Sequence, residues 1–455
     1  MGIKNVSSSM RYSAAIETVR FAAILAVSLS VSGCGEESLR GLFVGYTPHE
    51  RYEQSLKRAG LDETALGRDW IAAAGRAVAH PVSISSPYHE VSYLDSREAH
   101  AVGYRVYLRR GQMITAQFES EKDTTYQVFL DMFVIPNDSD GSPILLTSAD
   151  SLEHGLEYVA RRDGDYIVRV QPELLRGGSY EITIVVGASL AFPVHGHDTT
   201  AIRSWFGDPR SGGAREHHGV DIFAPRGTPV IAVAKGTVRS TRPNNLGGLV
   251  VWLRDELGRS LYYAHLDSQA VRRGDLVEVG DTLGFVGNSG NARTTPPHLH
   301  FGMYWGGPSD PYPALRELPS TPAQFAGDAK RIGELARVAR NVARVREEPR
   351  GRSRVLVELP LHTPLRILGG SGGWYRVDLP DGTVGFIAAN LTEPADQPIR
   401  SAVIAEGGVL RAEPKSTADP VESLSAGSEV PVLGTYGGFL YVQAPSGRAG
   451  WLSLD

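Results

Sequence analysis

The chain of 455 residues has a single cysteine, Cys34, and a small net charge. One cysteine excludes an intramolecular disulfide and a metal site built from several thiolates. The 46 Lys and Arg residues are offset by 51 Asp and Glu residues, for a net charge of −5. No nucleic-acid partner is therefore expected, because such binding favours a basic face. After the first 34 residues, no apolar run reaches the roughly 20 residues that a membrane-spanning helix needs.

Glycine and proline, in contrast, are abundant, with 51 and 28 residues. Such numbers imply many turns and favour short strands over long helices. At roughly 100–200 residues per domain, the length predicts two to four domains. A hydrophobic content of 42% with 21% charged residues is typical of folded globular chains. We therefore expect a mainly β, multidomain protein.

Residues 1–34 have the features of a signal peptide and are set apart from the fold. A basic segment precedes an apolar run of 11 residues at 21–31, which is too short to span a bilayer. The sequence VSGC at 31–34 follows and resembles the bacterial lipobox. The resemblance implies lipidation of Cys34, a lipid anchor in a membrane and a location in the bacterial cell envelope. Gly35 is not the acidic residue that often retains lipoproteins at the inner membrane, so the outer membrane is favoured.

Changes in periodicity predict the next boundaries. A capping box at 47–50 opens a helical pattern, and we interpret residues 35–85 as a helical spacer. Residues 86–188 alternate apolar and polar side chains between glycine-containing turns, which predicts an antiparallel β-sandwich. The end of that segment resembles the pre-peptidase C-terminal domains of secreted bacterial proteases. Residues 319–340 are predicted to form a basic helical linker.

The last part of the chain contains an internal repeat. The motif REEP at 346–349 recurs as RAEP at 411–414, and later motifs recur at the same offset of about 65 residues. The two copies, 341–395 and 400–455, resemble bacterial SH3-like domains. The resemblance implies two small β-barrels, and such modules in secreted bacterial proteins often bind cell-wall peptides.

Histidines gather in the middle of the chain, where seven of the thirteen lie between residues 195 and 300. His217 and Asp221 are four residues apart and so lie on one side of a strand or a helical turn. His298 and His300 are two apart, so in a strand they point to the same face. These spacings suit metal ligands. Taken alone, however, the first spacing is common, and the alternative for the second is a pair of surface histidines on a half-exposed strand. For a lone histidine in an apolar strand, such as His265, the alternative is a core side chain.

His265 lies in an otherwise apolar segment, LYYAHL at 261–266. Together with HHGVD at 217–221 and HLHFG at 298–302, it resembles the lysostaphin-type zinc endopeptidases, which cut the peptide bridges of bacterial peptidoglycan. The resemblance implies a domain at 189–318 with an antiparallel β-sheet.

The resemblance assigns the zinc ligands to His217, Asp221 and His300, and two further catalytic positions to His265 and His298. Three protein ligands leave one of the four positions of tetrahedral Zn²⁺ for water. The ion would acidify that water and polarise the scissile carbonyl. Amide hydrolysis also needs a base for the water and donors for the oxyanion, and either histidine is a candidate for each task.

The sequence therefore predicts a metalloendopeptidase with one Zn²⁺ per chain, which hydrolyses peptide stems or cross-bridges of peptidoglycan. Tethering by the SH3-like domains would raise its local concentration on the wall. Two alternatives stay open: a catalytically silent or autoinhibited wall-binding regulator of other hydrolases, and a metalloprotease that acts on proteins. The upstream pair His195 and His197 is interpreted as solvated loop residues, with an extra ligand or an inhibitory cap as the alternative.

Overall fold

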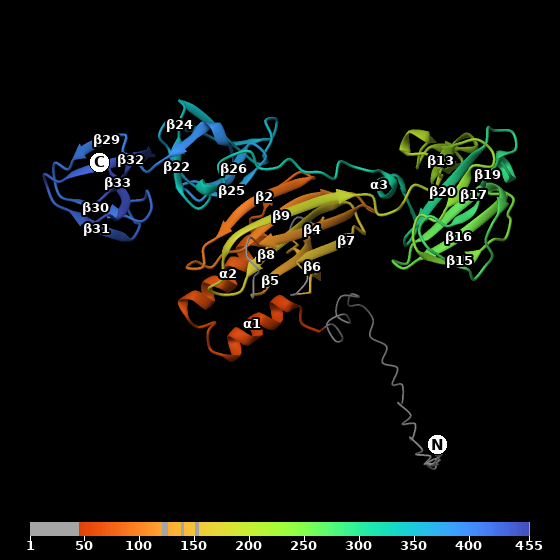
Figure 1. Cartoon of the computed structure of the whole chain (residues 1–455), viewed down its shortest axis with the longest axis horizontal. Coiled ribbons are helices and arrows are strands. Elements are labelled where there is room, and N and C mark those ends of the chain that lie inside the picture. Colours follow the sequence, from red (N-terminus) through yellow and green to blue (C-terminus); the bar gives the residue numbers. More distant parts are fainter. Residues whose placement is uncertain (1–44, 121–125, 138–140, 151–153, 455) are drawn as a thin grey trace, which may run out of the picture. The chain divides into compact units, whose positions relative to one another are not determined.

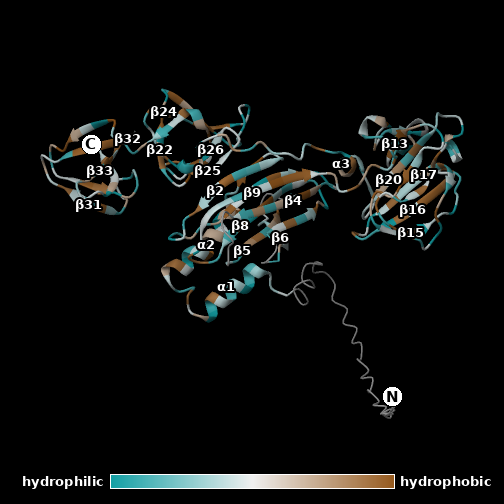
Figure 2. Cartoon of the chain, in the orientation of Figure 1, coloured by the Kyte–Doolittle hydropathy of each residue, from teal (hydrophilic) through white to brown (hydrophobic). Residues whose placement is uncertain are grey.

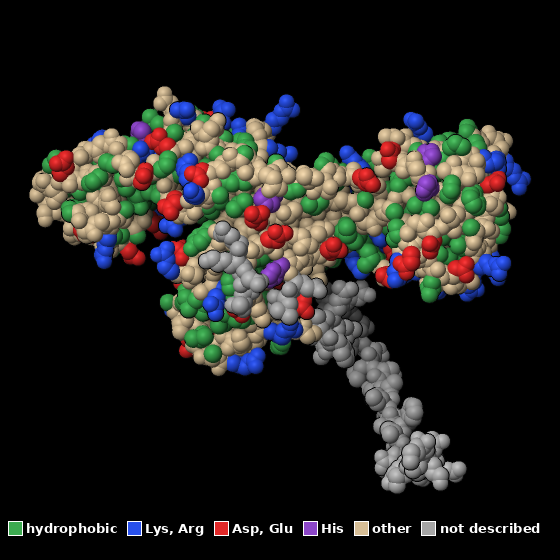
Figure 3. All heavy atoms as spheres, in the orientation of Figure 1, with side chains coloured by type: hydrophobic (Ala, Val, Ile, Leu, Met, Phe, Trp, Pro, Cys, Tyr) green, Lys and Arg blue, Asp and Glu red, His purple; other side chains and the backbone are tan. Residues whose placement is uncertain are grey.

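The computed structural model describes residues 45–120, 126–137, 141–150 and 154–454. Cys34 and the expected signal peptide lie outside the described residues. Strands predominate and are arranged in several sheets (Figure 1), which confirms the predicted mainly β, multidomain fold class. Apolar residues gather on these strands (Figure 2). In the described part of the chain, no helix is long and apolar enough to cross a bilayer. On the face shown in Figure 3, acidic and basic side chains are interspersed.

The first sheets form a β-sandwich. Its strands are β1 (Val82–Ser83), β2 (Tyr88–Leu94), β3 (Val102–Leu108), β4 (Met113–Ser120), β5 (Val128–Val134), β6 (Ile144–Ser148), β7 (Gly155–Val159), β8 (Gly164–Pro172) and β9 (Gly178–Gly187). One sheet has the order β1-β3-β8-β5-β6, and the other contains β2-β9-β4-β7. Alternate residues of both sheets face inward and form one core that includes Tyr104, Ile114, Tyr166 and Ile182.

Two helices, α1 (Pro48–Arg58) and α2 (Ala65–Ala79), precede the sandwich. The predicted capping box at Thr47 and Glu50 is present and begins α1. Trp70 of α2 is 1% exposed, packs on Phe129 of β5 and donates its indole N–H to the carbonyl of Pro172 at 2.9 Å. The interpretation of this segment as a spacer is therefore wrong. The helices belong to the sandwich domain, because β5 has apolar residues on both of its faces and needs a cover.

A second group of strands forms the histidine-rich domain. They are β10 (Ile202–Ser204), β11 (Pro209–Arg210), β12 (Arg215–Glu216), β13 (Val220–Phe223), β14 (Pro229–Ile231), β15 (Gly236–Ser240), β16 (Leu249–Asp255), β17 (Ser260–Gln269), β18 (Leu276–Val277), β19 (Thr282–Val286), β20 (His298–Tyr304) and β21 (Pro308–Ser309), followed by α3 (Tyr312–Leu315). The main sheet has the order β10-β13-β20-β17-β16-β15-β18. Fully buried residues such as Val220, Leu261 and Phe301 fix its central strands in one core.

The C-terminal part folds into two barrels with one topology. The first has β22 (Leu335–Val338), β23 (Val342–Arg346), β24 (Val355–Pro360), β25 (Pro364–Ser371), β26 (Trp374–Asp378), β27 (Val384–Ala388) and β28 (Thr392–Pro394). The second has β29 (Arg400–Val403), β30 (Gly408–Arg411), β31 (Pro420–Leu424), β32 (Glu429–Tyr436), β33 (Phe439–Gln443) and β34 (Ala449–Ser453). The neighbour orders β22-β25-β26-β27-β23-β24 and β29-β32-β33-β34-β30-β31 correspond strand by strand, as the sequence repeat requires.

The helix expected within 319–340 is absent from the structure. This stretch contains only a short 3₁₀ turn at Ala329–Arg331, and β22 begins at Leu335. Ala336 and Val338 point into the first barrel and are fully buried, while β22 pairs with β25 and β28. The prediction was wrong because burial at a spacing of two residues outweighs the helix propensity of an alanine- and arginine-rich stretch.

The sandwich and the first barrel share a sheet. Strand β2 pairs with β9 on one side and with β25 on the other. A buried ion pair crosses this junction, where the Arg376 guanidinium lies 2.8 Å from the Glu90 carboxylate and the two side chains are 5% and 0% exposed. The hydroxyl of Tyr104 also donates to Glu90 at 3.1 Å. Burial opposes the charge of Arg376, but Glu90 holds the pKa of that guanidinium well above its ordinary value.

We expect Arg376→Met to lower the stability of the junction strongly. Removing one partner leaves Glu90 as an uncompensated buried charge, which costs about 3–5 kcal/mol. Arg366→Met is the matched control, because the Arg366 side chain is 55% exposed and lies 4.0 Å from its partner Glu98. Differential scanning calorimetry of the two variants measures the difference. Equal unfolding temperatures would contradict a stabilising role for the buried pair.

Candidate active site

Three polar side chains from neighbouring strands meet at one point in the histidine-rich domain. Asp221 on β13 lies directly opposite His300 on β20, and His217 comes from the segment just before β13. The Asp221 Oδ1 atom lies 3.0 Å from both His217 Nε2 and His300 Nδ1, and these two nitrogens are 2.9 Å apart. Among the described residues, this is the one group of three His, Cys, Asp or Glu side chains close enough to share a metal ion.

The donor atoms fit a divalent metal ion. Donors at about 2 Å from a tetrahedral ion are separated by about 3.3 Å, which is close to the observed spacing. The Nδ1–H of His217 donates to the carbonyl of Trp205 at 2.7 Å, so its Nε2 lone pair faces the other two donors. Gly219 makes room for the site, since a Cβ there would lie 2.9 Å from Cε1 of the His300 ring.

The charge distribution also suits a cation. Burial opposes ionisation of Asp221, but the adjacent His217 and His300 hold the pKa of this carboxyl well below its usual range. Burial lowers the pKa of His300, which keeps the imidazole neutral as a metal ligand requires. The second carboxylate oxygen of Asp221 accepts from Arg210 of β11 at 2.7 Å. This contact orients Asp221 so that Oδ1 points to the two histidines.

Two further histidines lie beside the cluster. The ring centroids of His265 and His298 are 5.0 Å apart. The Nδ1–H of His265 donates to the Ser289 carbonyl and that of His298 to the Pro296 carbonyl, both at 2.9 Å. Because a carbonyl only accepts, the Nε2 atom of each neutral ring keeps a free lone pair. Burial, with a smaller effect of His298, lowers the pKa of His265 to about 4, so this ring is neutral at neutral pH.

His265 occupies a strained backbone position. Its φ of 64° is in the left-handed region, which costs a residue with a side chain roughly 1–3 kcal/mol. The pairing of β17 with β20 ends at the preceding residue, Ala264, and the backbone N–H of His265 donates instead to the carbonyl of Gly247 at 2.7 Å. This local departure from strand geometry turns the His265 ring toward His300, with ring centroids 6.0 Å apart.

The cluster opens into a cleft of about 730 Å³. One wall is aromatic and consists of Trp252, Tyr262 and Tyr304, with the first two rings 4.3 Å apart. The loop at 288–291 contributes Asn291 to the lining. The cleft therefore has room for several residues of an extended peptide, and the His217, Asp221 and His300 cluster lines it together with both additional histidines.

The structure brings together all five residues that the sequence singled out, and all of them line this cleft. His195 and His197 are not part of it. His195 is exposed, and the ring of His197 interacts with the His195 carbonyl at 3.0 Å.

The sequence analysis did not identify Arg210 or the carbonyl of Trp205, which orient Asp221 and His217. Both residues lie in a turn-rich stretch just before the first histidine motif. Their closeness to that motif in the chain was the only signal of a role in the site.

Two described protein families match parts of this chain. Residues 215–311 match peptidase family M23, and residues 341–393 match the bacterial SH3 domain. The chain thus contains a domain of a metallopeptidase family and, after it, a bacterial SH3 domain. These matches confirm the resemblance to the lysostaphin-type peptidases and that of residues 341–395 to bacterial SH3-like domains. The second barrel repeats the topology of the first.

Individual relatives cover only part of the chain. L-Ala–D-Glu endopeptidase of Bacillus subtilis is 40% identical over 141 residues, which are 28% of this chain and 43% of that protein. Peptidoglycan DD-endopeptidase ShyC of Vibrio cholerae is 37% identical over 93 residues, 20% of this chain and 21% of that protein. The solved catalytic domain of lysostaphin from Staphylococcus simulans is 32% identical, with 25% of this chain and 90% of that chain covered and a TM-score of 0.23. The chain spans less than half the length of the two curated relatives.

We expect His217→Ala to abolish stoichiometric metal binding. The change removes one of the three expected ligands, and the neighbouring carboxylate cannot take its place. His218→Ala is the matched control, since the His218 side chain is exposed and does not belong to the three-residue cluster. Mass spectrometry of the metal content after dialysis measures the difference. Equal metal content in the two variants would contradict this assignment of ligands.

Proposed function

We propose that the protein is a zinc-dependent endopeptidase that hydrolyses peptide bonds in the stems or cross-bridges of bacterial peptidoglycan. The observation that carries the proposal is the meeting of His217, Asp221 and His300 with His265 and His298 in one cleft. Two relatives are named for different bonds, L-Ala–D-Glu and DD. The proposal therefore concerns the class of substrate and leaves the bond open.

The donor set supports Zn²⁺ as the metal. Two imidazoles and one carboxylate are typical of catalytic zinc sites, in which three protein ligands leave one position open. When bound, zinc supplies Lewis acidity to the substrate carbonyl and acidifies a water molecule. His217 Nε2, Asp221 Oδ1 and His300 Nδ1 would hold the ion, and Arg210 would keep Asp221 in the required orientation.

His265 and His298 supply the acid–base chemistry in this proposal. An Nε2 lone pair accepts a proton from the attacking water, and the resulting imidazolium donates to the developing oxyanion or to the leaving amine. The carbonyls of Ser289 and Pro296 keep each ring in the tautomer that this needs. The aromatic wall of the cleft gives an apolar surface to the substrate chain, which fixes the scissile bond near the cluster.

The other parts of the chain suggest where the enzyme works. We propose that a lipid anchor at Cys34 holds it in the cell envelope, at the outer membrane, and that the SH3-like barrels bind peptidoglycan. Tethering by both would raise the local concentration of the cleft on its substrate. A catalytically silent regulator would have no need for three ligands and two oriented histidines, so the geometry favours the enzyme over that alternative.

The test is release of peptides from purified sacculi by the metal-loaded chain. His265→Ala should keep its metal and lose at least a hundredfold in turnover, because general acid–base groups contribute roughly 10²–10⁴-fold. His195→Ala should behave as the parent, since His195 lies outside the cleft. Muropeptide analysis by liquid chromatography measures the rate and identifies the bond.

If the Ala variant folds poorly, His265→Gly provides a second test, because glycine relieves the left-handed strain at this position. Full turnover by a His265 variant would contradict the proposed mechanism. Cleavage of a denatured protein in preference to sacculi would contradict the proposed substrate.

A further inference from the structure

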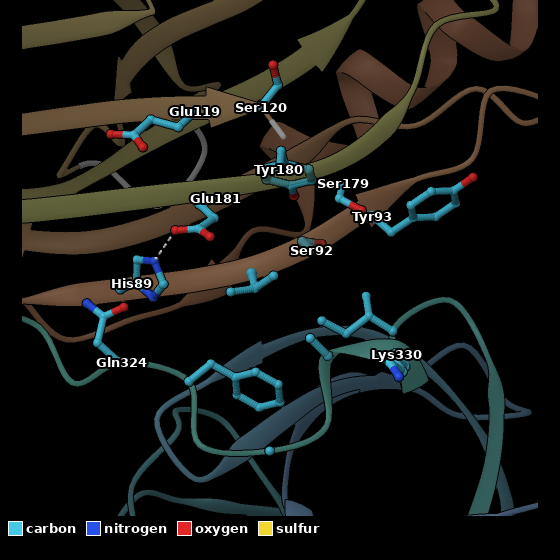
Figure 4. Close-up of a pocket in the computed structure, with 15 residues that line it drawn as sticks. His89, Ser92, Tyr93, Glu119, Ser120, Ser179, Tyr180, Glu181, Gln324 and Lys330 are labelled. Atoms are coloured by element: carbon cyan, nitrogen blue, oxygen red, sulfur yellow. Dashed lines mark hydrogen bonds and ion pairs between the residues drawn. The ribbon is translucent and has the colours of Figure 1, made fainter. Parts of the chain in front are cut away.

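His89 of the sandwich shows how a buried histidine is held within a regular ladder. It lies on β2, and its Nε2 atom lies 2.9 Å from the Glu181 carboxylate of the paired strand β9 (Figure 4). The two strands pair in unbroken register, so the ladder itself places both side chains. His265 of the candidate active site is also buried, but it lies where the register of its sheet shifts. It therefore needs support from outside the ladder.

The register of β16 and β17 shifts around His265. On β16 the paired residues Leu249 and Val251 are two positions apart. Their partners on β17, Leu266 and Tyr263, are three positions apart, so β17 has one extra residue in a β-bulge. Where a bulge contains a left-handed residue, that residue is typically glycine. His265 takes this conformation with a φ of 64°, so the contacts around it must hold it there.

The hydroxyl of Ser289 joins the two strands beside this bulge. Its Oγ atom accepts from the backbone N–H of Leu249 at 2.9 Å and donates to the carbonyl of Leu266 at 2.7 Å. Because Leu249 and Leu266 are register partners, the hydroxyl bridges the pair at which the bulge begins. A serine before a helical turn commonly caps that turn. Ser289 precedes the 3₁₀ turn at Gly290–Ala292, but its side chain makes no capping hydrogen bond and contacts the strands instead.

The carbonyl of Ser289 holds the ring of the same histidine. It accepts from the Nδ1–H of His265 at 2.9 Å. Ser289 thus contacts the backbone next to His265 through its hydroxyl and selects the direction and tautomer of the ring through its carbonyl. Since both groups belong to one residue, the hydroxyl also keeps the carbonyl in a fixed position relative to β17.

The loop at 244–248 gives a second support to His265. The carbonyl of Gly247 accepts from the backbone N–H of His265 at 2.7 Å. The same loop approaches Ser289 closely at Gly248, where an added Cβ would collide with the Oγ atom of Ser289. The two loops that hold His265 therefore meet at the Ser289 hydroxyl.

We infer that Ser289 is a positioning residue for His265. Its hydroxyl maintains the bulge, its carbonyl directs the ring, and the Nε2 lone pair of His265 is thereby kept available to the cleft. Ser289 is not among the residues that line the cleft, so it acts through His265 and not on the substrate. The effect on turnover rests on the proposed function, whereas the effect on the His265 ring does not.

The first measurement compares the steady-state kinetics of Ser289→Ala and the parent, both as the zinc-loaded full chain. Cross-linked muropeptides, released from sacculi by a muramidase, are the soluble substrates. We expect kcat to fall at least about tenfold, because a small misplacement of a catalytic group is costly. KM and zinc content should not change, since the variant alters neither the lining of the cleft nor the metal ligands.

Two further variants serve as controls. Ser289→Thr retains the hydroxyl and should keep a kcat much closer to that of the parent. Ser240→Ala is the matched control, because it also deletes a serine hydroxyl that accepts a backbone N–H, that of Arg242 at 3.3 Å. Ser240 lies on β15, and this hydrogen bond involves neither β17 nor the loop at 288–291.

The second measurement is independent of activity. Isotope labelling of the histidine ring nitrogens distinguishes the two neutral tautomers by NMR, and the His265 signal is identified by its loss in His265→Gln. The parent should show the Nδ1–H tautomer, whereas Ser289→Ala should show a mixture of both, because the carbonyl no longer selects one. If Ser289→Ala folds poorly, Ser289→Cys takes its place, since a thiol is only a weak donor and acceptor.

An unchanged kcat in the hydroxyl-free variant would overturn the inference. A lower kcat with an unchanged His265 signal would also overturn it, because Ser289 would then act on something other than His265. A parent chain that cleaves no muropeptide would contradict the proposed function. In that case the NMR comparison would still decide whether Ser289 positions the His265 ring.

Discussion

The antiparallel pairing of β13 with β20 is the constraint on which the candidate site depends. It sets Asp221 opposite His300 and Phe223 opposite His298, so that Asp221, His298 and His300 share one face of the strand pair. A slip of one residue would turn each of these side chains to the other face of the sheet. Fully buried neighbours, Val220 and Phe301, oppose each other in the same ladder and make such a slip costly. Packing of the core thus determines how Asp221 and His300 lie relative to each other.

Much of this could be predicted from the sequence, because the signals are local. Alternation of polar and apolar residues indicates strands, and histidines two residues apart in a strand share a face. The contribution of His265 could be predicted only from family resemblance, since its side chain reaches the cluster through a left-handed backbone position that no spacing rule anticipates. Arg210 was missed for a related reason. Its contact with Asp221 depends on how a turn folds back, and turns carry little periodic signal.

The two errors of fold prediction have a common physical origin in tertiary packing. Because Trp70 packs against the sandwich, the helical segment covers that domain and is not a spacer. Because Val338 is buried in the first barrel, its segment forms a strand and not the expected linker helix. In both cases local propensity is worth a few tenths of a kcal/mol per residue, whereas burial of one large side chain is worth about 1.5–3 kcal/mol. The partner that decides the outcome lies far away in the chain, so the sequence pattern alone does not contain it.

Charge compensation distinguishes Asp221 from the carboxylates of the buried ion pairs. The buried structural carboxylates are each satisfied by an arginine: Glu90 by Arg376, Asp131 by Arg169, and Asp255 by Arg259. Asp221 differs in its second oxygen, which faces the rings of His217 and His300. The corresponding oxygen of Asp131 accepts from the Ser148 hydroxyl, and that of Asp255 accepts from the backbone N–H of Arg259. Burial lowers the pKa of His300 and keeps its ring neutral, so this ring does not compensate the negative charge of Asp221. A divalent cation at this point would be bound by the carboxylate and by the lone pairs of the two imidazoles at once.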